Sequence, residues 1–158
     1  MQYVIIRPPL VYGPGVKANF KKLMGIVHRG VPLPFGSIDN RRSLVSLDNL
    51  VSLIRRCIDH PNATNEIFLV SDDHDVSTSE LMRILADAMN VRDRLILFPK
   101  TLLSIAAALF GKQEIRRRLL DNLQVDIAKT KSVLGWLPES RLEDAIRLTA
   151  RNYLLRAK

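Results

Sequence analysis

The sequence contains little cysteine, few aromatic residues and no long apolar run. Its single cysteine, Cys57, excludes an internal disulfide and a cysteine-based zinc site, and it is typical of a reducing, cytoplasmic setting. Cys57 lies in an apolar helical pattern, which predicts a small buried residue. The longest apolar run, 102–110, is far shorter than the roughly 18–20 residues that cross a bilayer. No membrane role is therefore predicted.

Residue patterns that bind metal are also missing. The three histidines have no carboxylate partners at metal-ligand spacing; they are His28, His60 and His74. His74 lies in an acidic run, 72–75, which superficially suggests a cation site. The run follows a predicted strand and precedes a predicted helix cap, so we interpret it as a polar loop. The sequence predicts no metal site.

The charge is strongly basic. The chain has 24 lysines and arginines against 16 acidic residues, for a net charge of +8. Such an excess favours nucleic acid, an acidic surface or a phosphorylated ligand. Basic residues are scattered except at Arg116–Arg118, and aromatics make up only 6% of the chain, whereas nucleic-acid binders often interleave the two types. Charge alone therefore leaves the partner open.

Hydrophobic periodicity predicts an α/β fold with few strands and several helices. Strands are predicted at 3–7, 42–47 and 66–70, with short extended pieces at 33–35 and 94–98. Pro8 and Pro9 end the first strand, and a turn is predicted at 12–15. Helices are predicted at 19–29, 49–59, 79–89, 102–110, 115–122, 127–134 and 142–154, with Asp48 and either Ser77 or Thr78 as N-caps.

So few strands in 158 residues indicate one domain or fragment, 1–158, that is part of a larger sheet. The first strand is of a central, buried type, yet nothing upstream pairs with it. We expect the fold to be incomplete at its N-terminal end. Exposed strand edges would then favour self-association, for example as a homodimer.

Four segments in order resemble the extended short-chain dehydrogenase/reductase family that acts on nucleotide sugars, UDP-galactose 4-epimerases and bacterial polysaccharide-pathway epimerases in particular. They are VIIRPPLVYGPG at 4–15, GVPLPFG at 30–36, RSLVSLDNL at 42–50 and DIAK with LGWLP within 126–138. The sequence departs from the family pattern at Leu44, where an aromatic is common, and at Ala128, where serine or threonine is common.

The resemblance implies the C-terminal, substrate-binding part of such an enzyme, without its N-terminal NAD-binding Rossmann domain. The glycine-rich turn that binds a pyrophosphate is absent, because no third glycine follows Gly13 and Gly15 at the needed spacing. The family's catalytic Tyr-x-x-x-Lys pair is absent as well: the fourth residue after each of the three tyrosines is Arg7, Val16 or Ala157. We expect no catalytic residue and no bound cofactor in this chain alone, and NAD in the complete enzyme.

The ligand that the resemblance implies is a UDP-sugar. Asn19 and Arg42 match family residues that contact the phosphates or sugar, with Phe20 beside Asn19. Leu33 and Phe35 match positions that flank uracil. Arg117 would add a second arginine to the diphosphate, and Pro8 and Pro9 would approach the nicotinamide ring of NAD. Core packing is the alternative for Phe20, Leu33 and Phe35, helix capping for Asn19, and a solvated arginine for Arg42 and Arg117.

The resemblance therefore implies the substrate-binding portion of a UDP-glucose or UDP-N-acetylglucosamine 4-epimerase, inactive by itself and completed by the missing N-terminal half. The sequence leaves open which sugar is bound, and whether the parent reaction is epimerisation, dehydration or reduction. The alternative function is a basic, non-enzymatic module that binds nucleic acid or an acidic partner. Steep salt dependence on duplex DNA would favour that alternative, and a response to UDP would favour the first.

Overall fold

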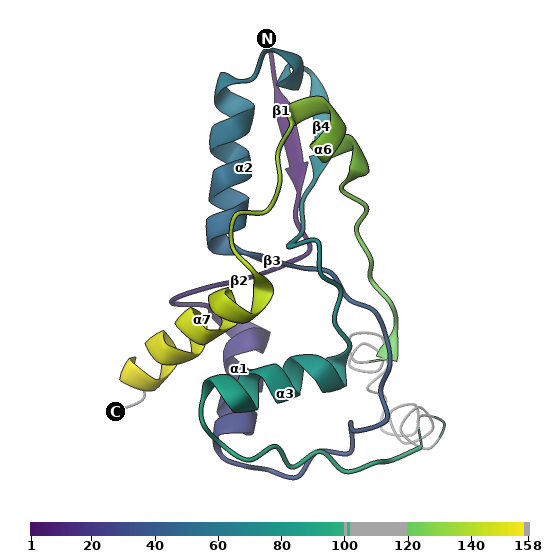
Figure 1. Cartoon of the computed structure of the whole chain (residues 1–158), viewed down its shortest axis with the longest axis vertical. Helices are drawn as coiled ribbons and strands as arrows, with labels where there is room; N and C mark the ends of the chain where they lie inside the picture. The colour runs from purple at the N-terminus through teal and green to yellow at the C-terminus, as the bar shows by residue number, and fades with distance from the viewer. Residues whose placement is uncertain (100, 102–119, 157–158) are drawn as a thin grey trace.

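The computed structural model describes residues 1–99, 101 and 120–156 (Figure 1). Strands and helices alternate in its first half, and helices follow. The described elements are β1 (Val4–Arg7), β2 (Leu10–Tyr12), α1 (Ala18–His28), β3 (Leu44–Ser46), α2 (Leu47–Asp59), the 3-10 helix η1 (Pro61–Ala63), β4 (Glu66–Leu69), α3 (Thr78–Ala88), α6 (Ala128–Leu134) and α7 (Leu142–Arg156). The predicted α/β class is confirmed, while the predicted helix at 102–110 and most of that at 115–122 lie outside the described residues.

The strands form two parallel pairs. β1 pairs with β4, with Ile5 opposite Ile67, and β2 pairs with β3, with Val11 opposite Val45. A parallel pair needs a crossover connection, which usually includes a helix. Here α2 lies between β3 and β4 in the chain, and Figure 1 shows it on one side of the β1–β4 pair with α6 on the other.

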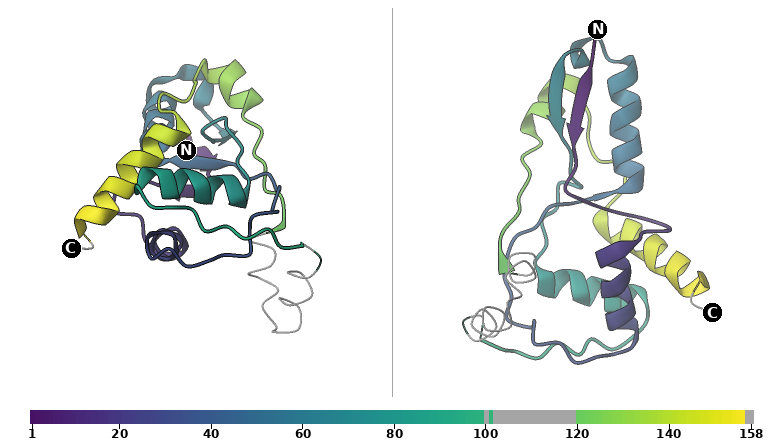
Figure 2. Two further views of the ribbon diagram at one scale, coloured as in Figure 1. Left: turned by 60° about the horizontal axis from the view of Figure 1, so that its bottom comes forward. Right: turned by 180° about the vertical axis from the view of Figure 1, so that it is seen from behind.

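The β2–β3 pair separates two hydrophobic cores. Neighbouring residues of a strand point to opposite faces, and in β3 Leu44 joins one core while Val45 joins the other. The first core packs α1, α3 and α7 together and includes Tyr12. The second is formed by α2, β4 and α6 with Trp136, whose indole N–H donates to Ser52 Oγ at 3.1 Å. The right-hand view of Figure 2 shows these two groups of elements at opposite ends of the molecule, with β1, β4, α2 and α6 at one end and α1, α3 and α7 at the other.

The structure corrects two expectations about local elements. Leu10–Tyr12 forms strand β2, where the sequence predicted only the approach to a turn; a three-residue strand is too short to show a periodicity of its own. Helix α2 begins at Leu47 and not after Asp48. Its N-cap is Ser46, whose hydroxyl accepts from the Asn49 N–H at 3.2 Å.

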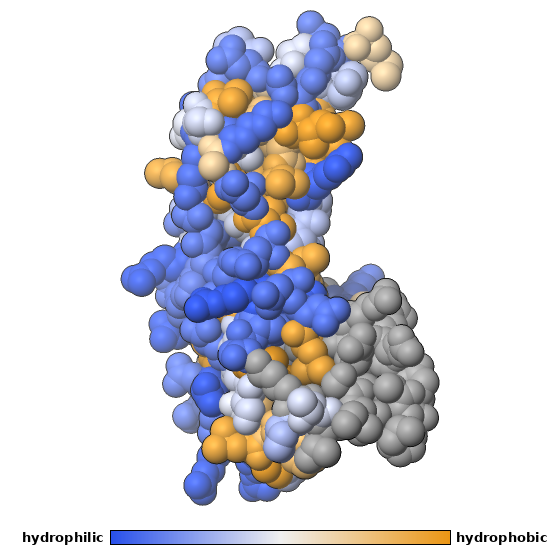
Figure 3. All heavy atoms as spheres, turned by 90° about the vertical axis from the view of Figure 1, so that its right-hand side faces the viewer, coloured by the Kyte–Doolittle hydropathy of each residue, from blue (hydrophilic) through white to orange (hydrophobic). Residues whose placement is uncertain are grey.

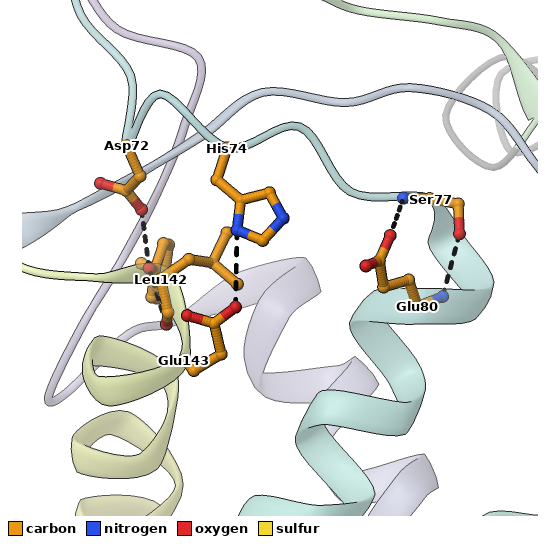
Figure 4. Close-up of polar contacts among 7 residues, drawn as sticks. Asp72, His74, Ser77, Glu80, Leu142 and Glu143 are labelled. Carbon is orange, nitrogen blue, oxygen red and sulfur yellow. Dashed lines mark hydrogen bonds and ion pairs between the residues drawn. The ribbon is translucent and has the colours of Figure 1, made fainter.

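The N-cap of α3 is Ser77, one of the two residues that the sequence offered for this position. Ser77 Oγ accepts from the Glu80 N–H at 3.0 Å, and the Ser77 N–H donates to Glu80 Oε2 at 3.4 Å (Figure 4). This reciprocal pair is a capping box, which satisfies backbone donors that a helix start otherwise leaves without partners. The start of α3 is thereby fixed next to Val76, which forms an isolated antiparallel bridge with Arg42.

Large apolar side chains are exposed around β1, β4 and α2. Figure 3 shows apolar side chains at the surface of the upper part of the molecule, which carries β1 and β4 in Figure 1. On α2 the exposed apolar residues follow a spacing of four, three and four, and so lie on one helix face: Leu47, Val51, Ile54 and Ile58. Parallel strands are normally covered on both faces. We call these four residues of α2, together with Tyr3, Val4, Ile5, Ile67 and Leu69, the uncovered apolar surface.

Candidate functional site

A cavity of about 400 Å³ opens between α1, the start of α3 and the extended segments around residues 33–35 and 42–44. Most of the side chains around it are apolar, with a few basic and amide groups. Its lining is Leu10, Asn19, Phe20, Lys22, Leu23, Ile26, Leu33, Phe35, Arg42, Leu44, Val76, Ser77, Thr78, Leu81 and Met82. Five of the six predicted substrate residues are therefore brought together here. The sixth, Arg117, lies outside the described residues.

Helix α1 supplies one wall. Residues three and four apart lie on the same helix face, and Asn19, Lys22, Leu23 and Ile26 follow that spacing. The N-cap of α1 is Lys17, without a side-chain cap. Asn19 is exposed at the cavity. Lys22 was not predicted, although its position one turn after Asn19 is a signal that could have identified it.

Phe20 has a double role. Its side chain is only 3% exposed, and its ring stacks on Tyr12 with centroids 5.5 Å apart. It belongs to the core and also forms part of the cavity wall. The two interpretations offered by the sequence, core residue and site residue, are thus compatible in the structure.

The segment 33–36 forms the opposite wall and is held by backbone hydrogen bonds to 94–96. Leu33 N–H donates to Arg94 O at 3.0 Å, and Gly36 N–H donates to Ile96 O at 2.9 Å. A Cβ on Gly36 would lie 2.9 Å from Ile96 O, so this close approach requires glycine. Leu33 and Phe35 are both half-buried and both line the cavity, as expected for alternate residues of an extended segment.

Arg42 is held in place through its backbone. Its N–H donates to Val76 O and its carbonyl accepts from Val76 N–H, each at 3.0 Å. The side chain lines the cavity, and its Nη1 donates to Asp121 O at 3.2 Å. Burial lowers the pKa of the guanidinium, and the charge of Asp121 acts in the opposite direction. The neighbouring Arg41 is exposed and lies outside this lining, since adjacent side chains of an extended segment point to opposite faces.

A buried polar cluster ties the elements of the site together. Asp72 accepts three hydrogen bonds: from Tyr12 Oη at 2.7 Å, from the Ser46 N–H at 2.9 Å and from Asn49 Nδ2 at 2.7 Å. Asn49 Oδ1 in turn accepts from the N–H of Ser140, just before α7, at 2.9 Å. Figure 4 shows Asp72 facing the first turn of α7. Burial, helped by the charge of Asp72, raises the pKa of the Tyr12 hydroxyl, so it remains a protonated donor.

The other polar side chains of the run 72–75 contact protein groups. Asp73 pairs with Lys131 Nζ at 2.6 Å, and His74 Nδ1 lies 3.5 Å from Glu143 Oε1 (Figure 4). Asp75 accepts from Gln124 Nε2 at 2.7 Å. No group of three or more metal-ligating side chains occurs in the described part of the chain. The polar-loop interpretation of this run agrees with these contacts.

Two predicted residues do not join the cavity. Pro8 and Pro9 lie between β1 and β2, Pro8 exposed and Pro9 half-buried, and neither is part of the lining. Their suggested contact with a nicotinamide ring remains a prediction.

The arginine cluster behind the nucleic-acid alternative falls in 102–119, outside the described residues. Within the described ranges, no helix has the length and apolar character of a membrane span.

Solved structures with the same fold define the class of protein to which this chain is similar. It matches a UDP-glucose 4-epimerase of Thermotoga maritima, determined with UDP-glucose, with a TM-score of 0.69 and 20% identity over 100% of this chain and 48% of that one. It matches a UDP-glucuronic acid 4-epimerase of Bacillus cereus, determined with UDP-glucuronic acid and NAD, with a TM-score of 0.71 and 16% identity over 97% and 45%. The fold is thus that of about half of a nucleotide-sugar epimerase.

Sequence similarity leads to a particular relative. The chain is 54% identical over 155 residues to a UDP-glucose 4-epimerase of Vibrio cholerae, covering 98% of this chain and 47% of the relative. It is 24% identical over 163 residues to an uncharacterized protein of Sinorhizobium fredii, covering 93% and 46%. The chain therefore spans about half the length of the curated relatives it matches. No family model matches it. The predicted resemblance to nucleotide-sugar epimerases is confirmed.

Proposed function

We propose that this chain forms the UDP-binding side of a nucleotide-sugar epimerase of the UDP-glucose or UDP-N-acetylglucosamine 4-epimerase type. The observation that carries the proposal is the convergence of five residues on one cavity. They come from three segments separated in the chain: Asn19 and Phe20 from α1, Leu33 and Phe35 from the extended segment, and Arg42 from the stretch before β3. The similarity to the Vibrio cholerae enzyme supports the same function.

The chemistry of the lining fits the two parts of UDP. A uracil ring requires a slot with apolar walls, which Leu33 and Phe35 provide. A diphosphate requires donors and positive charge, and Arg42 offers a planar fork of N–H groups. Lys22 and Asn19 add a second cation and an amide on the facing helix. The sugar would extend from the diphosphate toward the reacting centre of the complete enzyme.

We expect that this chain does not form an NAD site by itself. Gly13 and Gly15 follow β2, and the turn that they form lacks the third glycine of a dinucleotide-binding motif. NAD supplies hydride acceptance and return in the complete enzyme, and the catalytic tyrosine and lysine would come from the N-terminal half. The role of this chain is to bind and orient the UDP-sugar. We further propose that it acts in the cytoplasm and that the uncovered apolar surface packs against that other half.

Titration with UDP tests this function. We expect Arg42→Ala to weaken UDP binding about 10- to 100-fold, because charge-assisted hydrogen bonds to phosphate are worth about 1.5–3 kcal/mol. The matched control is Arg41→Ala, which removes the same charge from an exposed neighbour and should change the Kd less than about twofold. Isothermal titration calorimetry measures both. Equal losses in the two variants would indicate a general charge effect and would contradict the proposed site.

A further inference from the structure

A second cavity, of about 330 Å³, lies on the other flank of α1, between the beginning of α1 and the end of α7. Its lining includes Lys17, Lys21 and Met24 from α1 and its N-cap, and Asn152, Tyr153 and Arg156 from α7. None of these residues lines the nucleotide-sugar cavity described above. Helix α1 therefore carries two separate cavities, one on each flank.

Three cations lie around this second cavity. Lys17, Lys21 and Arg156 make no ion pair and no side-chain hydrogen bond within residues 1–99, 101 and 120–156. No carboxylate belongs to the described lining. By contrast, Arg147 on the same helix α7 pairs with Asp87 and Asp144. Like charges gathered around one cavity repel each other, and a bound anion would relieve that repulsion.

Arg156 and Asn152 both lie next to the turn that precedes α1. Arg156 lies against the turn before α1, since a Cβ on Gly15 would be 3.6 Å from Arg156 Nη1. Gly15 has φ of +83°, a conformation that favours glycine, and its N–H donates to Asn152 Oδ1 at 3.1 Å. That bond holds the Asn152 amide at the rim, where its NH₂ group is a further donor. The Tyr153 hydroxyl, close to Gly25, is another.

From this geometry we infer that the cavity formed by Lys17, Lys21, Asn152, Tyr153 and Arg156 binds a small phosphate-bearing anion, in addition to the nucleotide-sugar site. Lysine ammonium groups act as point charges for phosphate, and the arginine fork can bind two of its oxygens at once. Met24, which is buried, also lines the cavity, so the cavity can accommodate a short apolar part of the ligand. The inference rests on this cavity alone and is independent of the proposed UDP site.

Titration of the chain with inorganic phosphate and with pyrophosphate, in a non-phosphate buffer at low salt, tests the inference. We expect saturable binding, weakened at least tenfold in the double variant Lys21→Gln/Arg156→Gln. The matched control, Arg29→Gln/Arg151→Gln, removes the same two charges next to α1 and from α7 but outside both cavities. It should retain binding within about twofold, since scattered surface charges contribute little. Circular dichroism checks that both variants fold.

The Arg42→Ala variant separates the two cavities. The inference requires phosphate to bind this variant as tightly as the original chain. It is overturned if Arg42→Ala abolishes phosphate binding, because the anion would then occupy the nucleotide-sugar cavity. It is equally overturned if no saturable binding occurs up to about 10 mM, the range of weak but specific sites, or if both double variants lose affinity alike.

Discussion

Asp72→Ala is expected to lower the free energy of unfolding by about 3–5 kcal/mol, because three buried donors lose their shared acceptor at roughly 1–3 kcal/mol each. Two of the donors, Tyr12 Oη and Asn49 Nδ2, keep a second, separate acceptor: the Leu142 carbonyl at 3.3 Å and the Ser140 carbonyl at 2.9 Å. The Ser46 N–H has none beyond Asp72. Since domains of this size are stable by only about 5–15 kcal/mol, the loss would be severe.

Urea unfolding followed by Trp136 fluorescence and by circular dichroism measures this change. The matched control is Asp73→Asn, which removes the charge of a neighbouring carboxylate that is exposed and paired with Lys131, and which keeps a residue type that tolerates the positive φ of this position. An exposed ion pair contributes about 0–1 kcal/mol, so this variant should unfold close to the original midpoint. If Asp72→Ala cost less than about 1 kcal/mol, or no more than Asp73→Asn, the cluster would not be what joins β2, β3 and α7.

Mixing this chain with the part of the Vibrio cholerae protein that it does not match is expected to produce a 1:1 complex and to restore UDP-glucose 4-epimerase activity with NAD. Each part alone should be inactive. The reason lies in β1, which pairs only with β4 among the described strands and leaves its other edge without a partner. Val4 and Ile5 on that strand are exposed. A further parallel strand would form hydrogen bonds with the backbone groups at that edge of β1. A helix packed over α2 would shield the uncovered apolar surface from solvent.

Size-exclusion chromatography with light scattering measures the association, and interconversion of UDP-glucose and UDP-galactose measures the activity. Ile54→Lys/Ile58→Lys on the exposed face of α2 should weaken the complex at least tenfold. Leu148→Lys/Leu155→Lys, which makes the same change at exposed positions of α7, should not. A mixture that neither associates nor gains activity would count against the proposed partner, and so would equal effects of the two variants.

The elements of the fold could be predicted where a physical signal is local. The β-branched run of β1, the apolar stripe of α3 and the Ser77 cap are all visible in the sequence. Strand β2 was not predicted because a run of three residues is too short to show the alternation of apolar and polar residues that identifies a strand. The cap of α2 was assigned to Asp48 because both Ser46 and Asp48 are good capping residues, and only the end of β3 decides between them.

The residues of the site could be predicted where they lie in segments that resemble the family's sequence motifs. Asn19, Leu33, Phe35 and Arg42 were chosen by resemblance, and the structure brings them to one cavity. The closing of that cavity by Val76, Leu81 and Met82 could not be predicted, because it depends on how α3 packs against α1. The cluster around Asp72 was likewise hidden: Tyr12 lies 60 positions from Asp72 in the chain, and the acidic run looked like an ordinary polar loop.

The most direct test of the central claim is a two-dimensional NMR titration of the isotope-labelled chain with UDP. The account predicts saturable shifts for the backbone amides of Asn19, Leu33, Phe35 and Arg42 and for the Arg42 guanidinium. Shifts confined to other surfaces, or none at millimolar UDP, would show that the cavity does not bind the nucleotide and would contradict the proposed function.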